Sequence, residues 1–118
     1  MATDVTWLGV TDTSWATASN WSDGAVPAAS DSVSIPAGAP NIDSGLDQSA
    51  IALASVYIEQ GYNGTIGDTS TDPATCLILN CDSLRIDGEC TAYLDLQHGG
   101  SAIDVTISAS ASARAGSY

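Results

Sequence analysis

Basic residues are almost absent from this chain. It contains no lysine and two arginines, Arg85 and Arg114, against fourteen acidic residues, so its formal net charge is −12. Proteins that bind nucleic acids neutralise phosphates with Lys and Arg, and anionic membrane surfaces attract the same residues. The sequence therefore predicts that neither nucleic acid nor membrane is a partner. The acids would form a solvated surface, face outward on an assembly or answer a basic partner.

Large apolar residues are also scarce, since the chain has no Phe, one Met and little Leu. A helical bundle needs long Leu-rich stripes, and a transmembrane helix needs about 20 consecutive apolar residues. The sequence contains neither. The residues before Trp7 show no basic segment and no apolar segment of the kind that marks a signal peptide. We therefore expect a single domain that has no signal peptide and is made in a cytosol.

Cysteine and histidine are too few and too irregularly spaced for a recognisable metal site. Cys76, Cys81 and Cys90 are separated by four and eight residues, and His98 is the one histidine. This spacing matches no strong zinc motif. In a reducing cytosol, the sequence predicts free thiols that are buried as small core residues.

Two acidic loops offer a weaker possibility, which is calcium binding. Asp68-Thr-Ser-Thr-Asp72 and the pair Asp43/Asp47 supply the carboxylate oxygens that hard cations prefer. Neither loop matches an EF-hand or the repeated Gly-Gly-x-Gly-x-Asp calcium coil. We expect solvated acidic loops and a protein with no metal and no cofactor.

After residue 50 the chain repeats a two-residue apolar pattern. Alternating pairs occur at Val56-x-Ile58, Leu77-x-Leu79, Leu84-x-Ile86, Leu94-x-Leu96 and Val105-x-Ile107. Alternation predicts strands with one buried face. The intervals are nearly constant: 21 residues from Val56 to Leu77, 21 from Leu84 to Val105, and 20 from Ile66 to Ile86. A fixed interval predicts that successive turns of chain stack their strands, as in a solenoid.

The sequence thus predicts an all-β fold, a short right-handed β-solenoid (β-helix) with a Trp-rich N-terminal cap. Residues 1–40 would form the cap and the first strands, residues 41–108 the solenoid body of the same domain, and residues 109–118 an Ala/Ser-rich C-terminal arm. The expected strands are 5–10, 31–36, 55–59, 65–66, 76–80, 83–87, 92–97 and 102–108. A β-sandwich or jelly roll is the alternative, although it usually needs longer strands and larger core residues.

The first half of the chain carries a pattern of Trp, Asn, Gly and Pro. It runs Trp7-x-Gly9, Trp15, Asn20-Trp21-Ser22-x-Gly24-x-x-Pro27 and Asp31-x-Val33-x-Ile35, then Gly45-Leu46-Asp47, Leu53, Val56-x-Ile58 and Tyr62-x-Gly64-x-Ile66-Gly67. The opening part resembles a box found in β-helical surface and virion proteins. The continuation is similar to small β-helical structural proteins of the phage head, of the capsid decoration, cement or head-fibre type. The resemblance covers residues 5–67.

This resemblance implies a β-helical, non-enzymatic virion protein on the exterior of a phage capsid, made in the host cytoplasm. Its partner would be the major capsid protein. A homo-oligomer, and a trimer in particular, would suit the three-fold positions of such a shell. Bacterial adhesins carry a similar box, usually behind a secretion signal. A surface adhesin or carbohydrate-binding β-helical module is therefore the alternative.

Residues of the opening box are candidates for a structural cap or for a partner contact. They are Trp7, Trp15, Asn20, Trp21, Gly24, Pro27 and Asp31. Three indoles near one end would shield the first turn of a solenoid and block edge-to-edge growth. Turn-forming residues would hold them there, and the aspartate would accept backbone N–H groups at a strand start. Exposed tryptophans would instead anchor a partner. We favour the cap.

The sequence singles out no catalytic residue. There is one His, no Lys and no Gly-x-Ser-x-Gly motif, and no carboxylate pair is marked out for glycoside hydrolysis. Arg85 is the one base within the predicted solenoid body. We expect it to lie on the surface as a partner of Asp82 or Asp87, and we predict that the protein is not an enzyme.

Overall fold

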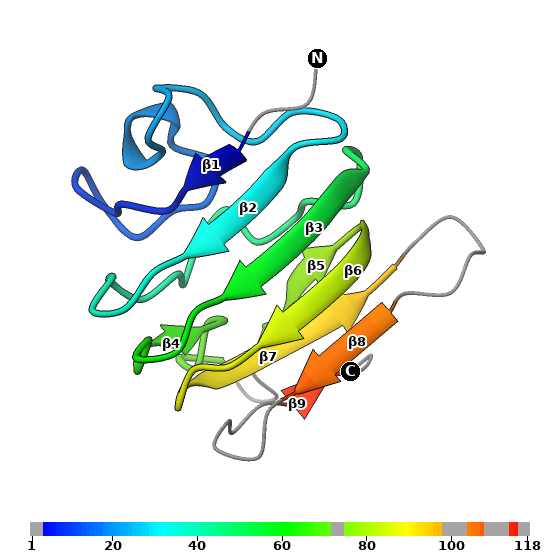
Figure 1. The fold of residues 1–118 in the computed structure, drawn as a ribbon. Helices are drawn as coiled ribbons and strands as arrows, with labels where there is room; N and C mark the ends of the chain where they lie inside the picture. The colour runs from blue at the N-terminus through cyan, green and yellow to red at the C-terminus, as the bar shows by residue number, and fades with distance from the viewer. Residues whose placement is uncertain (1–3, 72–74, 98–103, 108–113, 116–118) are drawn as a thin grey trace.

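The computed structural model describes residues 4–71, 75–97, 104–107 and 114–115, which wind as a parallel β-solenoid (Figure 1). One sheet has the order β1-β2-β3-β6-β8. Its strands are β1 (Asp4–Thr6), β2 (Ser32–Ile35), β3 (Leu53–Ile58), β6 (Cys81–Ile86) and β8 (Asp104–Ile107). The other sheet has the order β4-β7-β5, with β9 also paired to β7. Its strands are β4 (Thr65–Ile66), β5 (Leu77–Leu79), β7 (Thr91–Leu96) and β9 (Arg114–Ala115).

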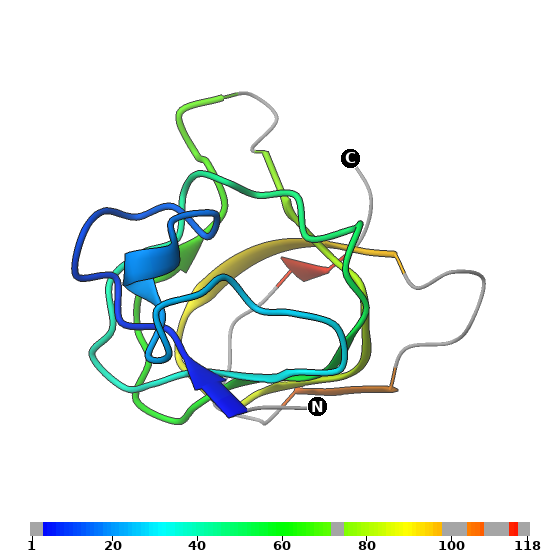
Figure 2. The ribbon, with the colours of Figure 1, turned by 90° about the horizontal axis from the view of Figure 1, so that it is seen from above.

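The two sheets lie on opposite sides of the coil in the view along it (Figure 2), and their buried side chains form one hydrophobic cluster. Every pair of named strands in the described residues is parallel. The predicted all-β solenoid is therefore confirmed, and the antiparallel sandwich or jelly roll is wrong. No helix within the described ranges is long and apolar enough to cross a membrane.

Like side chains stack in register along the inner face of the five-stranded sheet. One inward column consists of Val5, Val33, Val56, Leu84 and Val105. Beside it, Ile35, Ile58 and Ile86 form a column that is fully buried. Burying a branched aliphatic side chain contributes about 1.5–3 kcal/mol. Because each column runs through successive turns, this burial is what holds one turn on the next.

The second sheet continues beyond its named strands as isolated bridges. Ser14 pairs with Ser44 and Ile42 with Ile66, both in parallel, and Ile66 then pairs with Ala92 of β7. The buried column Ile42, Ile66 and Ala92 closes the core from this side. Cap and body therefore share one core, because residues 4–40 already contribute to both faces of the coil.

The pairing partners of the strands correct the sequence analysis. Leu84 pairs with Val105, as its 21-residue interval predicted. Val56 does not stack on Leu77 but pairs with Leu84, which lies 28 residues later. Leu77 belongs to the opposite sheet and pairs with Leu94. The interval between Val56 and Leu77 thus joins two faces of the coil and is not a repeat.

The interval from Ile66 to Ile86 is not a repeat of the coil either, because Ile66 pairs with Ala92. The turns differ in length because a loop between β4 and β5 leaves the coil. Asp68 and Thr75 close the base of this loop with reciprocal backbone hydrogen bonds of 2.9 Å. Such an insertion lengthens one turn without changing the inward columns on either side of it.

The first expected strand, 5–10, ends early, at Thr6. From Trp7 the chain leaves the sheet and forms an antiparallel bridge to Trp21. Gly9, with a φ of +59°, then turns it away from the strand direction. The short β1 is therefore a consequence of the cap, because the residues after Thr6 pair with the cap instead of continuing the ladder.

Candidate functional site

The three indoles of the opening box lie buried above the first turn of the coil. Trp7, Trp15 and Trp21 are 0%, 1% and 2% exposed. Trp21 lies between the other two, with ring centroids 5.2 Å from Trp7 and 4.7 Å from Trp15 in edge-to-face geometry. Such pairs stabilise by about 0.5–1.5 kcal/mol beyond the area that they bury. The stacking platform expected of a carbohydrate-binding module is thus not on the surface.

Each indole N–H donates a hydrogen bond inside the protein. Trp7 Nε1 donates to the carbonyl of Pro40 at 3.0 Å, and Trp21 Nε1 donates to the carbonyl of Trp15 at 2.9 Å. Trp15 Nε1 donates to the side-chain oxygen of buried Gln48. Two of these acceptors belong to the next turn of the coil. The bonds therefore fix the cap to the solenoid as well as satisfying the buried N–H groups.

Asn20 organises the loop around the cap. It ends a single 3₁₀ turn, Ala18–Asn20, and is fully buried. Its Oδ1 accepts the backbone N–H groups of Thr11 and Asp12 at 2.9 and 3.1 Å. Its Nδ2 donates to Asp12 Oδ1 at 2.7 Å and to the Ser14 carbonyl at 2.9 Å. The amide oxygen thus accepts two hydrogen bonds and the amide nitrogen donates two. Only one orientation of the side-chain amide allows all four.

The remaining residues of the box shape the return to the sheet. Gly24 adopts a φ of +74°, a conformation that favours glycine, and Pro27 is buried. Asp31 is 4% exposed and its Oδ2 accepts the N–H of Ala28 at 2.8 Å, just before β2 begins. This is the structural role that the sequence analysis assigned to an aspartate at a strand start.

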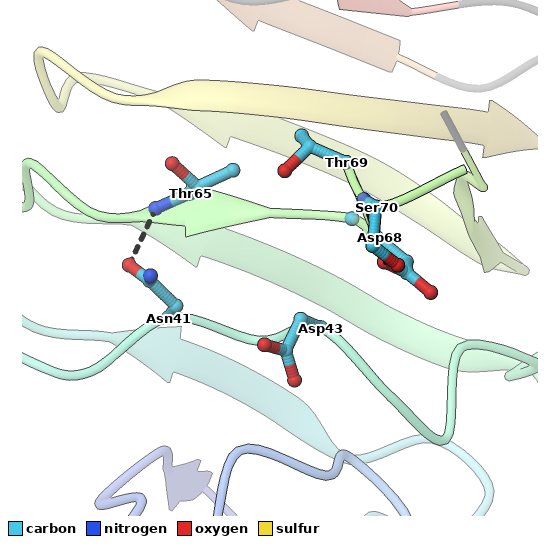
Figure 3. Close-up of a pocket in the computed structure, with 7 residues that line it drawn as sticks. Asn41, Asp43, Thr65, Asp68, Thr69 and Ser70 are labelled. Atoms are coloured by element: carbon cyan, nitrogen blue, oxygen red, sulfur yellow. Dashed lines mark hydrogen bonds between the residues drawn. The ribbon is translucent and has the colours of Figure 1, made fainter. Parts of the chain in front are cut away.

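A polar hollow of about 250 Å³ lies on the outside of the second face (Figure 3). It is lined by Asn41, Asp43, Thr65, Gly67, Asp68, Thr69 and Ser70. From the sequence, Asp43 was expected with Asp47 and Asp68 with Asp72. The structure instead brings Asp43 and Asp68 to one hollow, whereas Asp47 does not line it and Asp72 lies outside the described residues.

The carboxylates of this hollow already have partners within the protein. Asp43 Oδ1 accepts the Thr13 hydroxyl, and Asp68 Oδ1 accepts the Ser70 N–H at 2.9 Å. Among the described residues, no group of three His, Cys, Asp or Glu side chains is placed to hold a metal ion. His98 lies outside that part of the chain. The hollow therefore offers polar contacts and no assembled cation cage.

An Asp-x-Ser turn recurs around the coil and affects the carboxyl pKa values. Hydrogen bonds from the hydroxyl and the N–H of Ser49 lower the pKa of Asp47, and those from Ser70 lower the pKa of Asp68 in the same way. The N–H of Ser14, followed by the Asn20 amide, lowers the pKa of Asp12. These groups stay ionised near neutral pH, so none of them is suited to general acid catalysis.

Arg85 lies on the outer face of the five-stranded sheet, with 62% of its side chain exposed. Its Nε donates to Asp87 Oδ2 at 2.9 Å, and its guanidinium lies over the Tyr57 ring at 5.4 Å from the centroid. The Tyr57 hydroxyl donates to the same Asp87 oxygen at 3.0 Å, which raises the tyrosine pKa. Of the two expected partners, the structure therefore selects Asp87 for the ion pair.

Cys76, Cys81 and Cys90 form no disulfide within the described residues; Cys81 and Cys90 are buried as expected of core thiols, whereas Cys76 is half-buried. Burial, followed by the nearby charge of Asp82, raises the pKa of Cys81 to about 11. Burial also raises the pKa of Cys90, and it raises the pKa of the half-buried Cys76 together with the charge of Asp95. Thiols with raised pKa values are poor nucleophiles at neutral pH.

The raised Cys81 pKa makes stability depend on alkaline pH. In the unfolded chain this thiol ionises near its ordinary pKa of 9.0, whereas in the native protein it stays protonated up to about 11. Ionisation therefore favours unfolding as pH rises through that window, by at most about 3 kcal/mol. We expect urea-unfolding free energies to fall between these pH values. The fall should be smaller for Cys81→Ala; an equal slope in both proteins would contradict the assignment.

The two ends of the solenoid differ in how they close. The indoles cover the first turn, whereas at the other end Val105 is 39% exposed. Its column partners Val5, Val33, Val56 and Leu84 are each 1% exposed. Among the described strands, β8 pairs on one side, with β6. The last turn therefore presents an apolar side chain and a strand edge that earlier turns cover.

Comparison with protein families, with characterised proteins and with solved structures gives no significant match to this chain.

Proposed function

We propose that this chain is a non-enzymatic virion structural protein that decorates or cements the outer surface of a phage capsid. The observation that carries the proposal is the difference between the two ends of the coil. A buried Trp cap covers the first turn, while at the last turn β8 pairs only with β6 among the described strands and Val105 is 39% exposed. A solenoid of this kind docks in one orientation, as a capsid decoration must.

The charge of the chain supports an exterior position. A formal charge of −12, with one described basic side chain that is already paired to Asp87, gives a strongly acidic surface. Such a surface repels packaged nucleic acid and keeps assembled particles apart in solution. It also favours a docking surface on the shell that is neutral or basic.

The ionisable groups support a non-enzymatic role. The carboxyl groups with shifted pKa values, on Asp12, Asp47 and Asp68, are stabilised in the ionised form. The thiols are stabilised in the protonated form, most strongly at Cys81. General acids need raised carboxyl pKa values, and thiol nucleophiles need lowered ones. Both kinds of shift run opposite to what a carboxylic general acid and a thiol nucleophile require at neutral pH.

The partner in this proposal is the major capsid protein. Cementing would arise because docking buries apolar surface and pairs strand edges across joints between capsomers. Only the assembled shell presents the complete site, so binding stabilises the shell by mass action. A trimer of this chain would match three-fold positions and would cover open edges of the coil.

The test uses capsids of the phage that carries the gene, prepared with the gene deleted. We expect the purified protein to cosediment with these capsids, to saturate at a fixed number of copies, and to raise the temperature at which they release DNA. Val105→Asp should abolish binding. Val10→Asp adds the same charge to a residue that is 73% exposed on the cap loop and should leave binding intact.

Melting curves of both variants separate lost docking from lost folding. If Val105→Asp binds capsids like the unchanged protein, the open end is not the docking surface. If the unchanged protein never sediments with capsids and is found instead on the cell surface, the proposed function is wrong and the adhesin class replaces it.

A further inference from the structure

The chain has four asparagines, and the side chains of three of them are held by hydrogen bonds. Asn20 makes four such bonds. Asn41 Oδ1 accepts the Thr65 N–H at 2.9 Å, and Asn80 Nδ2 donates to the Ser49 carbonyl at 3.0 Å. Asn63 is the exception, because no hydrogen bond joins its amide to any residue that the structure describes.

Asn63 lies in the exposed turn between β3 and β4. It lines a surface hollow of about 300 Å³ together with Gln60, Gly61 and Glu89. Water therefore reaches the amide, and the side chain is free to rotate toward the following peptide. The backbone N–H of Gly64 also donates to no acceptor within the described ranges.

Packing requires glycine at the next position. A Cβ on Gly64 would lie 2.5 Å from the Tyr62 hydroxyl oxygen and 2.9 Å from Asn41 Oδ1. Tyr62 is fully buried, and its hydroxyl donates to the Pro40 carbonyl at 3.1 Å, so it cannot move aside easily. The Asn63-Gly64 peptide is thus one in which no side chain shields the backbone nitrogen.

We propose that Asn63 is a site of spontaneous deamidation in the folded protein. The Gly64 backbone nitrogen attacks Cγ of Asn63 and loses its proton; the C–N bond of the side-chain amide breaks and ammonia leaves, closing a succinimide ring. Water then opens the ring at either carbonyl. One opening gives aspartate, and the other gives isoaspartate, in which the backbone runs through the former side chain. The net reaction consumes one water and releases one ammonia.

The two products differ in their effect on the fold. Aspartate only adds a charge, which changes the formal net charge from −12 to −13. Isoaspartate lengthens the backbone just before β4, where Gly64 O accepts the Thr91 N–H at 3.2 Å and Thr65 pairs with Thr91. The added backbone atom shifts this register, so isoaspartate loosens the contact between β4 and β7.

The experiment incubates the native protein in neutral and mildly alkaline buffer and follows each asparagine by peptide mapping. Mass spectrometry detects the change from amide to acid, and isoaspartyl methyltransferase labelling detects isoaspartate. We expect Asn63 to react about tenfold faster or more than Asn41 and Asn80. The hydrogen bonds of those two amides must first break, and the side chains of the following Ile42 and Cys81 hinder attack by the backbone nitrogen, whereas Gly64 has none. Base should accelerate the reaction, since the attacking nitrogen must lose a proton.

Two variants and one comparison make the result decisive. Asn63→Gln should abolish the fast reaction, because its longer side chain closes a less favourable ring. Asn63→Asp should melt like the unchanged protein, whereas the isoaspartate fraction should melt lower. In urea, Asn41 and Asn80 should lose their protection. Native deamidation at Asn63 that is no faster than at these two residues, or that is strongly slower than in urea, would overturn the proposal. None of these outcomes depends on the proposed capsid role.

Discussion

Trp21→Ala should destabilise the protein by about 3–5 kcal/mol, the usual range for removing a buried Trp. Trp21 is 2% exposed and lies between the rings of Trp7 and Trp15, so its loss leaves a cavity at the centre of the cap. The substitution also removes the indole N–H bond to the Trp15 carbonyl. Urea unfolding followed by circular dichroism measures the loss directly.

Val10→Ala is the control for this prediction. Val10 lies in the same cap but is 73% exposed, so the substitution should change the free energy of unfolding by less than about 0.5 kcal/mol. If Trp21→Ala costs no more than Val10→Ala, the indoles are not packed in solution. The interpretation of the opening box as a partner contact would then replace the cap.

The existence and type of the strands follow from local sequence. The expected strand 65–66 coincides with β4, and the expected strands 76–80 and 92–97 differ from β5 (Leu77–Leu79) and β7 (Thr91–Leu96) by one residue at each end. Alternation identifies these strands because every second residue points inward and must be apolar. Residues 109–118 were expected as an arm, and their described part, β9, is a strand on β7.

Strand pairing does not follow from local sequence. Leu77 and Leu84 carry the same pattern, yet they belong to opposite sheets, because every turn of the coil crosses both faces. The interval between equivalent residues depends on loop length, and the loop closed by Asp68 and Thr75 lengthens one turn. Only the pair Leu84 and Val105 was predicted correctly, because those two residues occupy equivalent positions on successive strands of one sheet.

The contacts of the cap and of the polar hollow do not follow from local sequence either. Asn20 was recognised as a turn residue, but its four hydrogen bonds depend on how residues 11–14 fold back over it. Gln48 was missed altogether, because nothing near it in sequence marks it as the acceptor of the Trp15 N–H. Asp43 and Asp68 meet in one hollow only through the bridge between Ile42 and Ile66. Long-range register, which the sequence does not encode locally, decides each of these contacts.

The second large effect is expected from Asn20→Asp, a change of nearly the same shape. The carboxylate can still accept the N–H groups of Thr11 and Asp12, but it cannot donate to Asp12 Oδ1 or to the Ser14 carbonyl. It also places two carboxylates about as close as the present 2.7 Å bond. A buried charge without its partner costs about 3–5 kcal/mol, so we expect a loss of that size at neutral pH.

The pH dependence identifies the cause of this loss. Burial and the Asp12 charge should raise the pKa of the new carboxyl above its unfolded value, so the variant loses stability as pH rises from about 4 towards neutrality. The double variant Asn20→Asp with Asp12→Asn returns a hydrogen-bond donor to the pair. In a double-mutant cycle it should be more stable than the sum of the two single changes predicts.

Asn63→Asp makes the same substitution in an exposed turn and should have little effect on stability. If Asn20→Asp is as mild as Asn63→Asp, the buried amide does not organise the cap; if its cost is the same at every pH, carboxylate repulsion is not the cause.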